Sequence, residues 1–208
     1  AGGVSANHIA KWDGSSWSAL GNGVYDVYSN PSVACLAVYD DGGGPALYAG
    51  GKFDNAGLVE AQNIAKWDGS RWSALGSGMS ADPFTGDTGE VYALAVYDNG
   101  GGPELYAGGG FTRAGGVSAE YIAKWDGSSW SKLGSGMNSS VRALAVYNDG
   151  GGPALYAGGW FTTAGGVSAN HIAKWDGSSW SKLGSGMNGS VRALTVHDDG
   201  SGPALYAG

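Results

Sequence analysis

The residues of this chain that could do chemistry are few, and most of them fall in repeated turns. Pairs of acidic or amide residues occupy four such turns. A calcium loop would need alternating acidic ligands followed by a glutamate, whereas Asp, Asn and Gly are the ordinary residues of tight turns. We therefore expect neither a metal site nor a cofactor. The pairs are Asp40-Asp41, Asp98-Asn99, Asn148-Asp149 and Asp198-Asp199.

The histidines and the single cysteine do not form a predicted cluster. His8 and His171 occupy equivalent positions in separate copies of a repeat, so a shared metal ion is not expected. Cys35 is matched by alanine in every other copy, which indicates a small buried side chain. No serine lies in a nucleophile elbow, and no phosphate-binding glycine loop precedes a helix. The sequence favours a non-catalytic protein, although carboxylates from different copies could converge at one centre.

Composition narrows the class of protein and of partner. Hydrophobic residues make up 42% of the 208 residues and charged residues 14%, which predicts a folded globular domain. A formal charge of −7 argues against nucleic acid and anionic membranes, which need clustered Lys and Arg. No apolar run is long enough to cross a bilayer, so we expect a soluble protein without membrane insertion.

The elements that must position these residues come from an internal repeat. The string IAKWDG occurs four times, and its tryptophans are 55, 58 and 50 residues apart. The string LYAG also occurs four times. A repeat of this length is one supersecondary unit that must stack on its neighbours. The tryptophans are Trp12, Trp67, Trp125 and Trp175, and the tyrosines are Tyr48, Tyr106, Tyr156 and Tyr206.

Each unit is predicted to contain four short β-strands separated by glycine-containing turns. In the third copy the strands are Val141–Tyr147, Ala154–Gly158, Ile172–Trp175 and Trp180–Leu183, and a longer loop joins the second strand to the third. Four-stranded units that stack radially form a β-propeller, which leaves only short edges. The predicted fold is an all-β propeller of four-stranded antiparallel blades.

The repeat resembles the kelch family. A double glycine (Gly158-Gly159), an aromatic residue followed by Asp (Trp175-Asp176) and a second tryptophan (Trp180) match its signature. The sequence pattern FTxAGG…IAKWDGSSWSxLGSGM resembles even more closely the propeller repeats of fungal cortical polarity markers and similar bacterial surface proteins. This resemblance implies the fold, whereas kelch-like propellers differ widely in function.

The predicted domain is one propeller over 1–208. Its blades are 33–75, 91–133 and 141–183; 191–208 supplies strands one and two of a closing blade, and 1–20 supplies strands three and four. We expect the N-terminal strands to complete that last blade. The chain could equally be part of a larger ring, or half of a ring made by two chains through self-association.

The paired tryptophans are predicted to pack between blades. They could instead stack on sugars, but they recur at the same place in every blade, and each buries roughly 150–250 Å² when packed. Trp160 is different, because the matching residues are Lys52 and Gly110. The predicted core tryptophans are Trp12, Trp17, Trp67, Trp72, Trp125, Trp130, Trp175 and Trp180.

The predicted binding site lies on the face that holds the loops between strands two and three and between strands four and one. These loops contain nearly all the variation between copies, including insertions at 22–32 and 80–90. Loops on a rigid scaffold commonly carry function. The candidate ligand-binding residues are Tyr25, Asp26, Tyr28, Lys52, Phe84, Asp87, Arg113 and Trp160.

These observations predict a non-catalytic propeller scaffold that binds a protein or a polysaccharide through its irregular face, outside the cell or in the cell envelope. A multivalent carbohydrate-binding lectin is the alternative, with about one site per blade. A fragment of a larger secreted enzyme is the third possibility.

Overall fold

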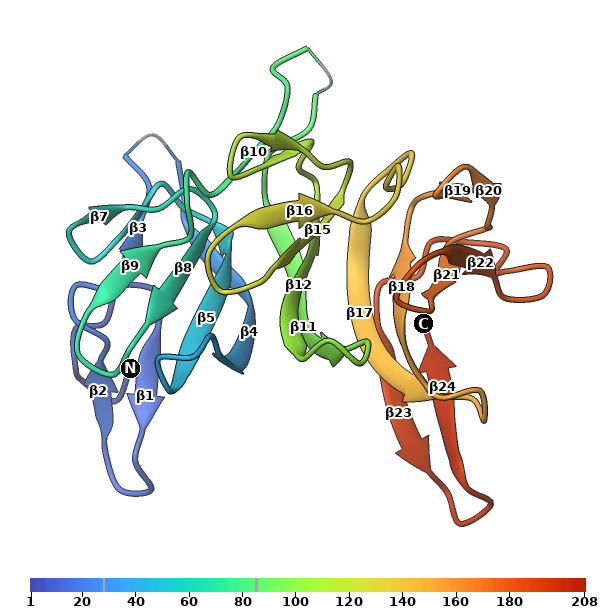
Figure 1. Cartoon of the computed structure of the whole chain (residues 1–208). Coiled ribbons are helices and arrows are strands. Elements are labelled where there is room, and N and C mark those ends of the chain that lie inside the picture. The colour runs from blue at the N-terminus through green and yellow to red at the C-terminus, as the bar shows by residue number, and fades with distance from the viewer. Residues whose placement is uncertain (28, 85) are drawn as a thin grey trace.

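The computed structural model describes residues 1–27, 29–84 and 86–208. Within these ranges all strand pairs are antiparallel and there is no helix, and hence none that could span a membrane. Three complete four-stranded sheets stand side by side in chain order (Figure 1). The predicted all-β class and the predicted four-stranded antiparallel unit are confirmed.

Each complete sheet is a meander in which every strand pairs with the next one of its unit. The first sheet contains β4 (Ser32–Asp40), β5 (Pro45–Lys52), β8 (Ile64–Trp67) and β9 (Trp72–Ala74). The second contains β11 (Val91–Asp98), β12 (Pro103–Gly109), β15 (Ile122–Trp125) and β16 (Trp130–Lys132). The third contains β17 (Val141–Asn148), β18 (Pro153–Gly159), β21 (Ile172–Trp175) and β22 (Trp180–Lys182).

Two further hairpins flank these sheets. The N-terminal hairpin consists of β1 (Ala10–Trp12) and β2 (Trp17–Ala19), and the C-terminal hairpin consists of β23 (Leu194–Asp198) and β24 (Pro203–Ala207). Each is a separate two-stranded sheet, and they lie on opposite sides of the molecule (Figure 1). The expected completion of the last blade by the N-terminal strands is not found: the two hairpins do not pair with each other, and the three complete sheets stand between them.

The connection between the second and third strands, predicted as a loop, forms a short hairpin in every complete unit. In the first two units this hairpin pairs with a strand from the connection that precedes the unit, and in the third a bridge joins Met137 to Ala164. The short strands are β3 (Val24–Tyr25), β6 (Asn55–Ala56), β7 (Val59–Glu60), β10 (Met79–Ser80), β13 (Arg113–Ala114), β14 (Val117–Ser118), β19 (Thr163–Ala164) and β20 (Val167–Ser168).

The first strands β4, β11, β17 and β23 contact one another in chain order, and the double glycine at the end of the second strand of each complete sheet permits this approach. A Cβ on Gly108 would lie 2.5 Å from Cγ1 of Val141 in the next sheet, and a Cβ on Gly109 would lie 2.1 Å from the carbonyl oxygen of Glu90. Real Cβ atoms do not come this close. The first glycine therefore lets adjacent sheets meet, and the second lets the first two strands meet.

The paired tryptophans tie each sheet to the one before it. Trp130 is 5% exposed, its ring centroid lies 5.3 Å from that of Trp125, and its indole N–H donates to the carbonyl oxygen of Leu75 in the preceding unit at 3.0 Å. Trp72 and Trp180 donate to the equivalent leucines. The second tryptophan of a unit thus contributes both apolar area and a hydrogen bond to the boundary between sheets.

The predicted core position does not hold for all eight tryptophans. Trp72, Trp125, Trp130, Trp175 and Trp180 are buried, and Trp67 is partly buried. Trp12 is 50% exposed and Trp17 is 40% exposed. These two differ because their hairpin has neither a preceding sheet nor the inner two strands of its own sheet to pack against.

Candidate functional site

A β-bulge near the start of each complete sheet's first strand turns one side chain out of the regular pattern. In β17, the pairing with β18 shifts register between Val141 and Ala143, so Arg142 is the extra residue of the bulge. The same shift occurs in β4 and β11. Bulges re-aim side chains and are common beside functional sites. The bulged residues are Ala34, Tyr92 and Arg142.

The C-terminal unit repeats this geometry. The N–H groups of Arg192 and Ala193 both donate to the carbonyl oxygen of Gly208, at 2.6 and 2.9 Å. Two successive residues thus face one residue of the opposite strand, as in the bulges of the complete sheets. Arg192 holds the position that corresponds to Arg142.

The side chains at these four equivalent positions line one hollow of about 400 Å³, together with Trp160. The hollow lies at the beginnings of the first strands, which is the face that carries the two insertions. One residue from each unit and one loop residue therefore meet at a single place. Because every unit contributes one residue to it, this hollow is shared by the units and is not a feature of each one.

Arg142 is held between two aromatic rings. Its guanidinium carbon lies 3.8 Å from the ring centroid of Tyr92 and 4.7 Å from that of Trp160, distances at which a cation is attracted to an aromatic face. Its Nε is buried and has no hydrogen-bond partner within the ranges the structure describes. Burial raises the pKa of Tyr92, so this phenol is neutral at physiological pH. The site therefore presents a fixed guanidinium with unused donor capacity.

The chemistry available in the hollow is that of binding. Arg142 and Arg192 can donate to a carboxylate, and the guanidinium fork suits bidentate pairing. Trp160 is 47% exposed and offers an aromatic surface on which a ring can stack. Across the part of the chain that the structure describes, no group of three or more His, Cys, Asp or Glu side chains could hold a metal ion.

Comparisons of the chain with protein-family models, with curated proteins and with solved structures found no match.

Of the residues predicted from sequence, Trp160 lies in the hollow. Lys52 ends β5 opposite Ser32 and does not line it. Tyr25 pairs with Asn55 in the short sheet β3-β6-β7 and does not line the hollow. Of these three predicted residues, the structure therefore places Trp160 in the lining of the hollow and the other two outside it.

The acidic residues of the insertions serve partly to hold their loops. Asp26 accepts a hydrogen bond from the backbone N–H of Ser29 at 2.9 Å, and Asp87 accepts one from the hydroxyl of Tyr121 at 2.9 Å. The predicted residue Tyr28 lies outside the described residues. These contacts order the loops around the hollow without contributing to its lining.

Phe84 and Arg113 also lie away from the hollow. Phe84 is 95% exposed in the second insertion, which projects from the molecule (Figure 1), and Arg113 is exposed in β13, opposite Ser118. Neither side chain lines the hollow. If they contact a ligand, that ligand must extend beyond the hollow.

Sequence reasoning missed Tyr92, Arg142 and Arg192 as site residues. Regular strand alternation gives no warning that these positions face a hollow, because the bulge that turns them there is a feature of pairing. One signal was present: the residue after the repeated valine at the start of each unit is Ala, Tyr, Arg and Arg in successive copies, although its neighbours hardly change.

Cys35 and the turn aspartates have local roles. Burial raises the pKa of the Cys35 thiol to about 12, so the thiol is protonated and unreactive. Asp176 accepts hydrogen bonds from the backbone N–H groups of Ser179 and Ser178 at 2.8 Å, and these bonds lower its pKa. The Asp-Gly-Ser turns therefore use their carboxylates to close the hairpin.

Proposed function

We propose that this chain is part of a kelch-like β-propeller that acts as a non-catalytic binding module outside the cell or in the cell envelope. Its proposed ligand is a polysaccharide that carries carboxylate groups, bound at the hollow between Tyr92, Arg142, Trp160 and Arg192. The side-by-side packing of four-stranded sheets through their first strands supports a propeller. The composition and the resemblance of the repeat support the location.

The observation that carries the proposed ligand is the guanidinium of Arg142 between Tyr92 and Trp160. Such an arrangement costs little reorganisation when an anion binds, because the contacts with the two rings already hold the cation in place. Arg192 adds a second positive charge to the hollow, in a chain whose net charge is −7. An anionic ligand would therefore find few other basic surfaces on this acidic protein.

A sugar backbone accounts for the remaining features of the hollow. Its rings can stack on the exposed indole of Trp160 while a uronic acid carboxylate pairs with Arg142 or Arg192. A multivalent lectin would require a separate site in every unit, whereas here the equivalent positions of the four units line one shared hollow. The proposal therefore specifies one site per chain.

Isothermal titration with oligogalacturonate provides the test, and the same oligosaccharide with methyl-esterified carboxylates serves as the matched ligand. We expect one site per chain for the acid form and at least about tenfold weaker binding of the ester, since a hydrogen bond to a charged group contributes about 1.5–3 kcal/mol. Arg142→Gln should weaken binding of the acid by a similar factor. Trp160→Ala should also weaken it.

Arg113→Gln is the control variant, because it removes an exposed arginine from the same face but outside the hollow. Its affinity should remain within about twofold of the parent, as expected for a charge that makes no direct contact. Equal binding of acid and ester, or equal effects of the two arginine variants, would rule out carboxylate recognition at this hollow. A stoichiometry near one ligand per unit would instead favour the lectin.

A further inference from the structure

The ring of Tyr92 is one wall of the hollow, and its phenol end sits in a narrow seat. A Cβ on Gly110 would lie 3.2 Å from the Tyr92 hydroxyl oxygen, 3.4 Å from Cε2 of the same ring and 3.5 Å from Oγ1 of Thr88. Oγ1 of Thr88 lies 3.4 Å from the Tyr92 hydroxyl oxygen. The phenol therefore fits between a glycine that follows β12 and a threonine of the second insertion.

The part of the second insertion that carries Thr88 is fixed to the second unit. The N–H of Gly89 donates to the carbonyl oxygen of Gly110 at 2.9 Å. Asp87 accepts a hydrogen bond from the hydroxyl of Tyr121 at 2.9 Å. These contacts lie on both sides of Thr88 in the chain, so they hold the threonine next to the phenol.

Comparison of the units shows that the seat belongs to the second one. Tyr92 coincides with Gly110, whereas in the third unit Arg142 coincides with Trp160. Gly110 is not among the glycines with a left-handed backbone, so its conformation would accept an alanine. The glycine is needed for space, because any larger side chain at this position would press on the phenol. The residue at 110 and the bulged residue at 92 are therefore matched to each other.

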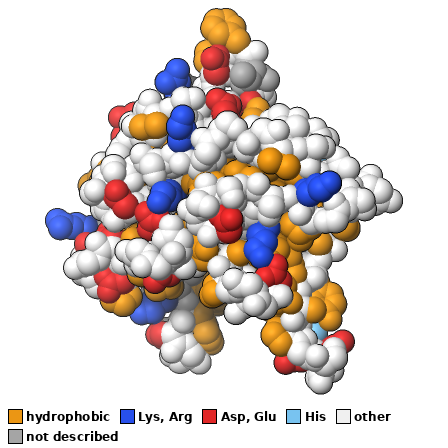
Figure 2. All heavy atoms as spheres, turned by 45° about the vertical axis from the view of Figure 1, so that its right-hand side comes forward, with side chains coloured by type: hydrophobic (Ala, Val, Ile, Leu, Met, Phe, Trp, Pro, Cys, Tyr) orange, Lys and Arg blue, Asp and Glu red, His pale blue; other side chains and the backbone are white. Residues whose placement is uncertain are grey.

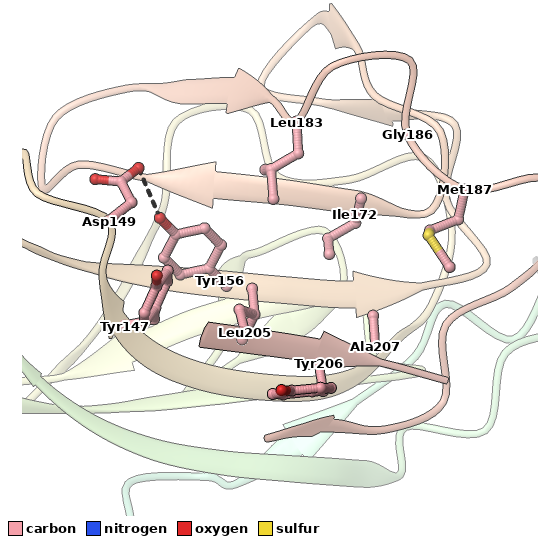
Figure 3. Close-up of a pocket in the computed structure, with 10 residues that line it drawn as sticks. All are labelled: Tyr147, Asp149, Tyr156, Ile172, Leu183, Gly186, Met187, Leu205, Tyr206 and Ala207. Carbon is pink, nitrogen blue, oxygen red and sulfur yellow. Dashed lines mark hydrogen bonds between the residues drawn. The ribbon is translucent and has the colours of Figure 1, made fainter. Parts of the chain in front are cut away.

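The seated ring faces a cation that no carboxylate holds. Lys174 lies 5.8 Å from the ring centroid of Tyr156 and is paired with Asp149, to which Tyr156 also donates (Figure 3). On the face shown in Figure 2, acidic side chains likewise lie near several of the Lys and Arg side chains. Arg142 is closer to its ring, at 3.8 Å from the Tyr92 centroid, and forms no ion pair among the residues that the structure describes. Aromatic contact therefore holds this guanidinium.

We propose that Tyr92 is a positioning residue: seated by Gly110 and Thr88, its ring fixes the guanidinium of Arg142 against Trp160. The second insertion then acts on the site through Tyr92, and its exposed tip does not contact the ligand. This inference deepens the proposed function and rests on it for the identity of the ligand. The placement of Arg142 is a property of the unliganded chain and can be measured separately.

Nuclear magnetic resonance of isotope-labelled arginine tests the placement without a ligand. The chain has four arginines, and the Nε–Hε signal of Arg142 is the one that disappears in Arg142→Lys. Rings on both sides should shift this signal upfield of the other three. Tyr92→Leu should move it back toward them, because one ring is removed, and Gly110→Ala should move it because a methyl group enters the seat. Tyr92→Phe keeps the ring and should retain most of the shift.

Isothermal titration with oligogalacturonate tests the consequence for binding. Tyr92→Leu should weaken binding by about tenfold, the value of a well-placed cation–π contact. Tyr92→Phe should stay within about fivefold of the parent, since it loses only a hydroxyl contact. The control is Phe84→Ala at the tip of the same insertion, which should stay within about twofold because this side chain makes no contact with the seat.

The two measurements separate this inference from the proposed function. A parent chain that does not bind oligogalacturonate refutes the ligand, while the Arg142 signal still decides whether Tyr92 positions the guanidinium. An Arg142 signal that is unchanged in both Tyr92→Leu and Gly110→Ala overturns the inference. Far-UV circular dichroism checks the fold of each variant, and Gly110→Ala decides alone if Tyr92→Leu does not fold. Equal loss of binding in Phe84→Ala and Tyr92→Leu also overturns it, since the insertion would then contact the ligand directly.

Discussion

Replacement of Trp130 with alanine removes a side chain that joins the second sheet to the first. The indole is 5% exposed, so most of the roughly 150–250 Å² that a tryptophan can bury is lost from the boundary. At about 25 cal/mol per Å² this area corresponds to about 4–6 kcal/mol, an upper bound because the unfolded chain already buries part of it. The hydrogen bond to Leu75 contributes about 1 kcal/mol. We expect a net loss of about 3–5 kcal/mol, in the range observed for large-to-small core changes.

The matched control is Trp17→Ala, which changes the same position of the repeat where the side chain is 40% exposed. It should cost roughly half to two thirds as much, because fewer of its atoms leave water on folding. A third variant, Trp130→Phe, keeps an aromatic ring but removes the indole N–H, and we expect it to fall between the other two.

Urea unfolding followed by circular dichroism measures the three free energies. Stacked repeats can unfold in more than one step. The slope of the unfolding free energy against urea concentration must therefore be the same in the parent and the variants before midpoints are converted to free energies. If Trp130→Ala and Trp17→Ala destabilise the chain equally, the argument that burial between sheets determines the effect is wrong.

Three further predictions concern single residues. Cys35 should react with a thiol reagent at pH 8 only after denaturant is added, because burial raises its pKa to about 12; rapid labelling of the native chain would contradict this. The pKa of Asp149 is lowered to about 2, first by its hydrogen bond from Lys174, so its stabilising effect is present above about pH 4 and is lost as the pH falls toward 2. The melting temperature of Asp149→Asn should therefore fall less than that of the parent over that acid range. An identical fall would refute a stabilising role for the pair of Asp149 and Lys174. Gly159→Ala should cost about 1–3 kcal/mol in chemical unfolding, because its Cβ would lie 2.2 Å from a backbone carbonyl oxygen; Gly189→Ala, with open space around it, is the control and should change little.

Much of the architecture was predictable because the repeat displays it several times. The third strand of the third unit was predicted at Ile172–Trp175 and is found there. The short hairpins between second and third strands were missed because each has only two residues per strand. A two-residue strand such as Thr163–Ala164 has no periodicity, and its pairing depends on the preceding unit.

The candidate site was predicted less well, for a different physical reason. Variation between copies drew attention to Trp160, which lines the hollow, and also to loop residues such as Asp87, which holds its own loop through Tyr121. The partner of Trp160 is Arg142, a strand residue. Reading strands as regular alternation hides a bulged position, since the bulge depends on how two strands pair and not on the composition of either one.

The bulge also explains why a single binding site can exist in a molecule of nearly identical units. Residues that form the boundary between sheets cannot vary, because each one fits a constant neighbour: a Cβ on Gly158, for example, would lie 2.4 Å from Val191. The bulged residue does not face that boundary, so its side chain can change from Ala34 to Tyr92 to Arg142 while the sheets stay the same. Exchange of Arg142 should consequently alter binding much more than stability. In the proposed function, the stacked units provide the rigidity, and positions that the stacking leaves free, such as Arg142 and Trp160, provide the specificity.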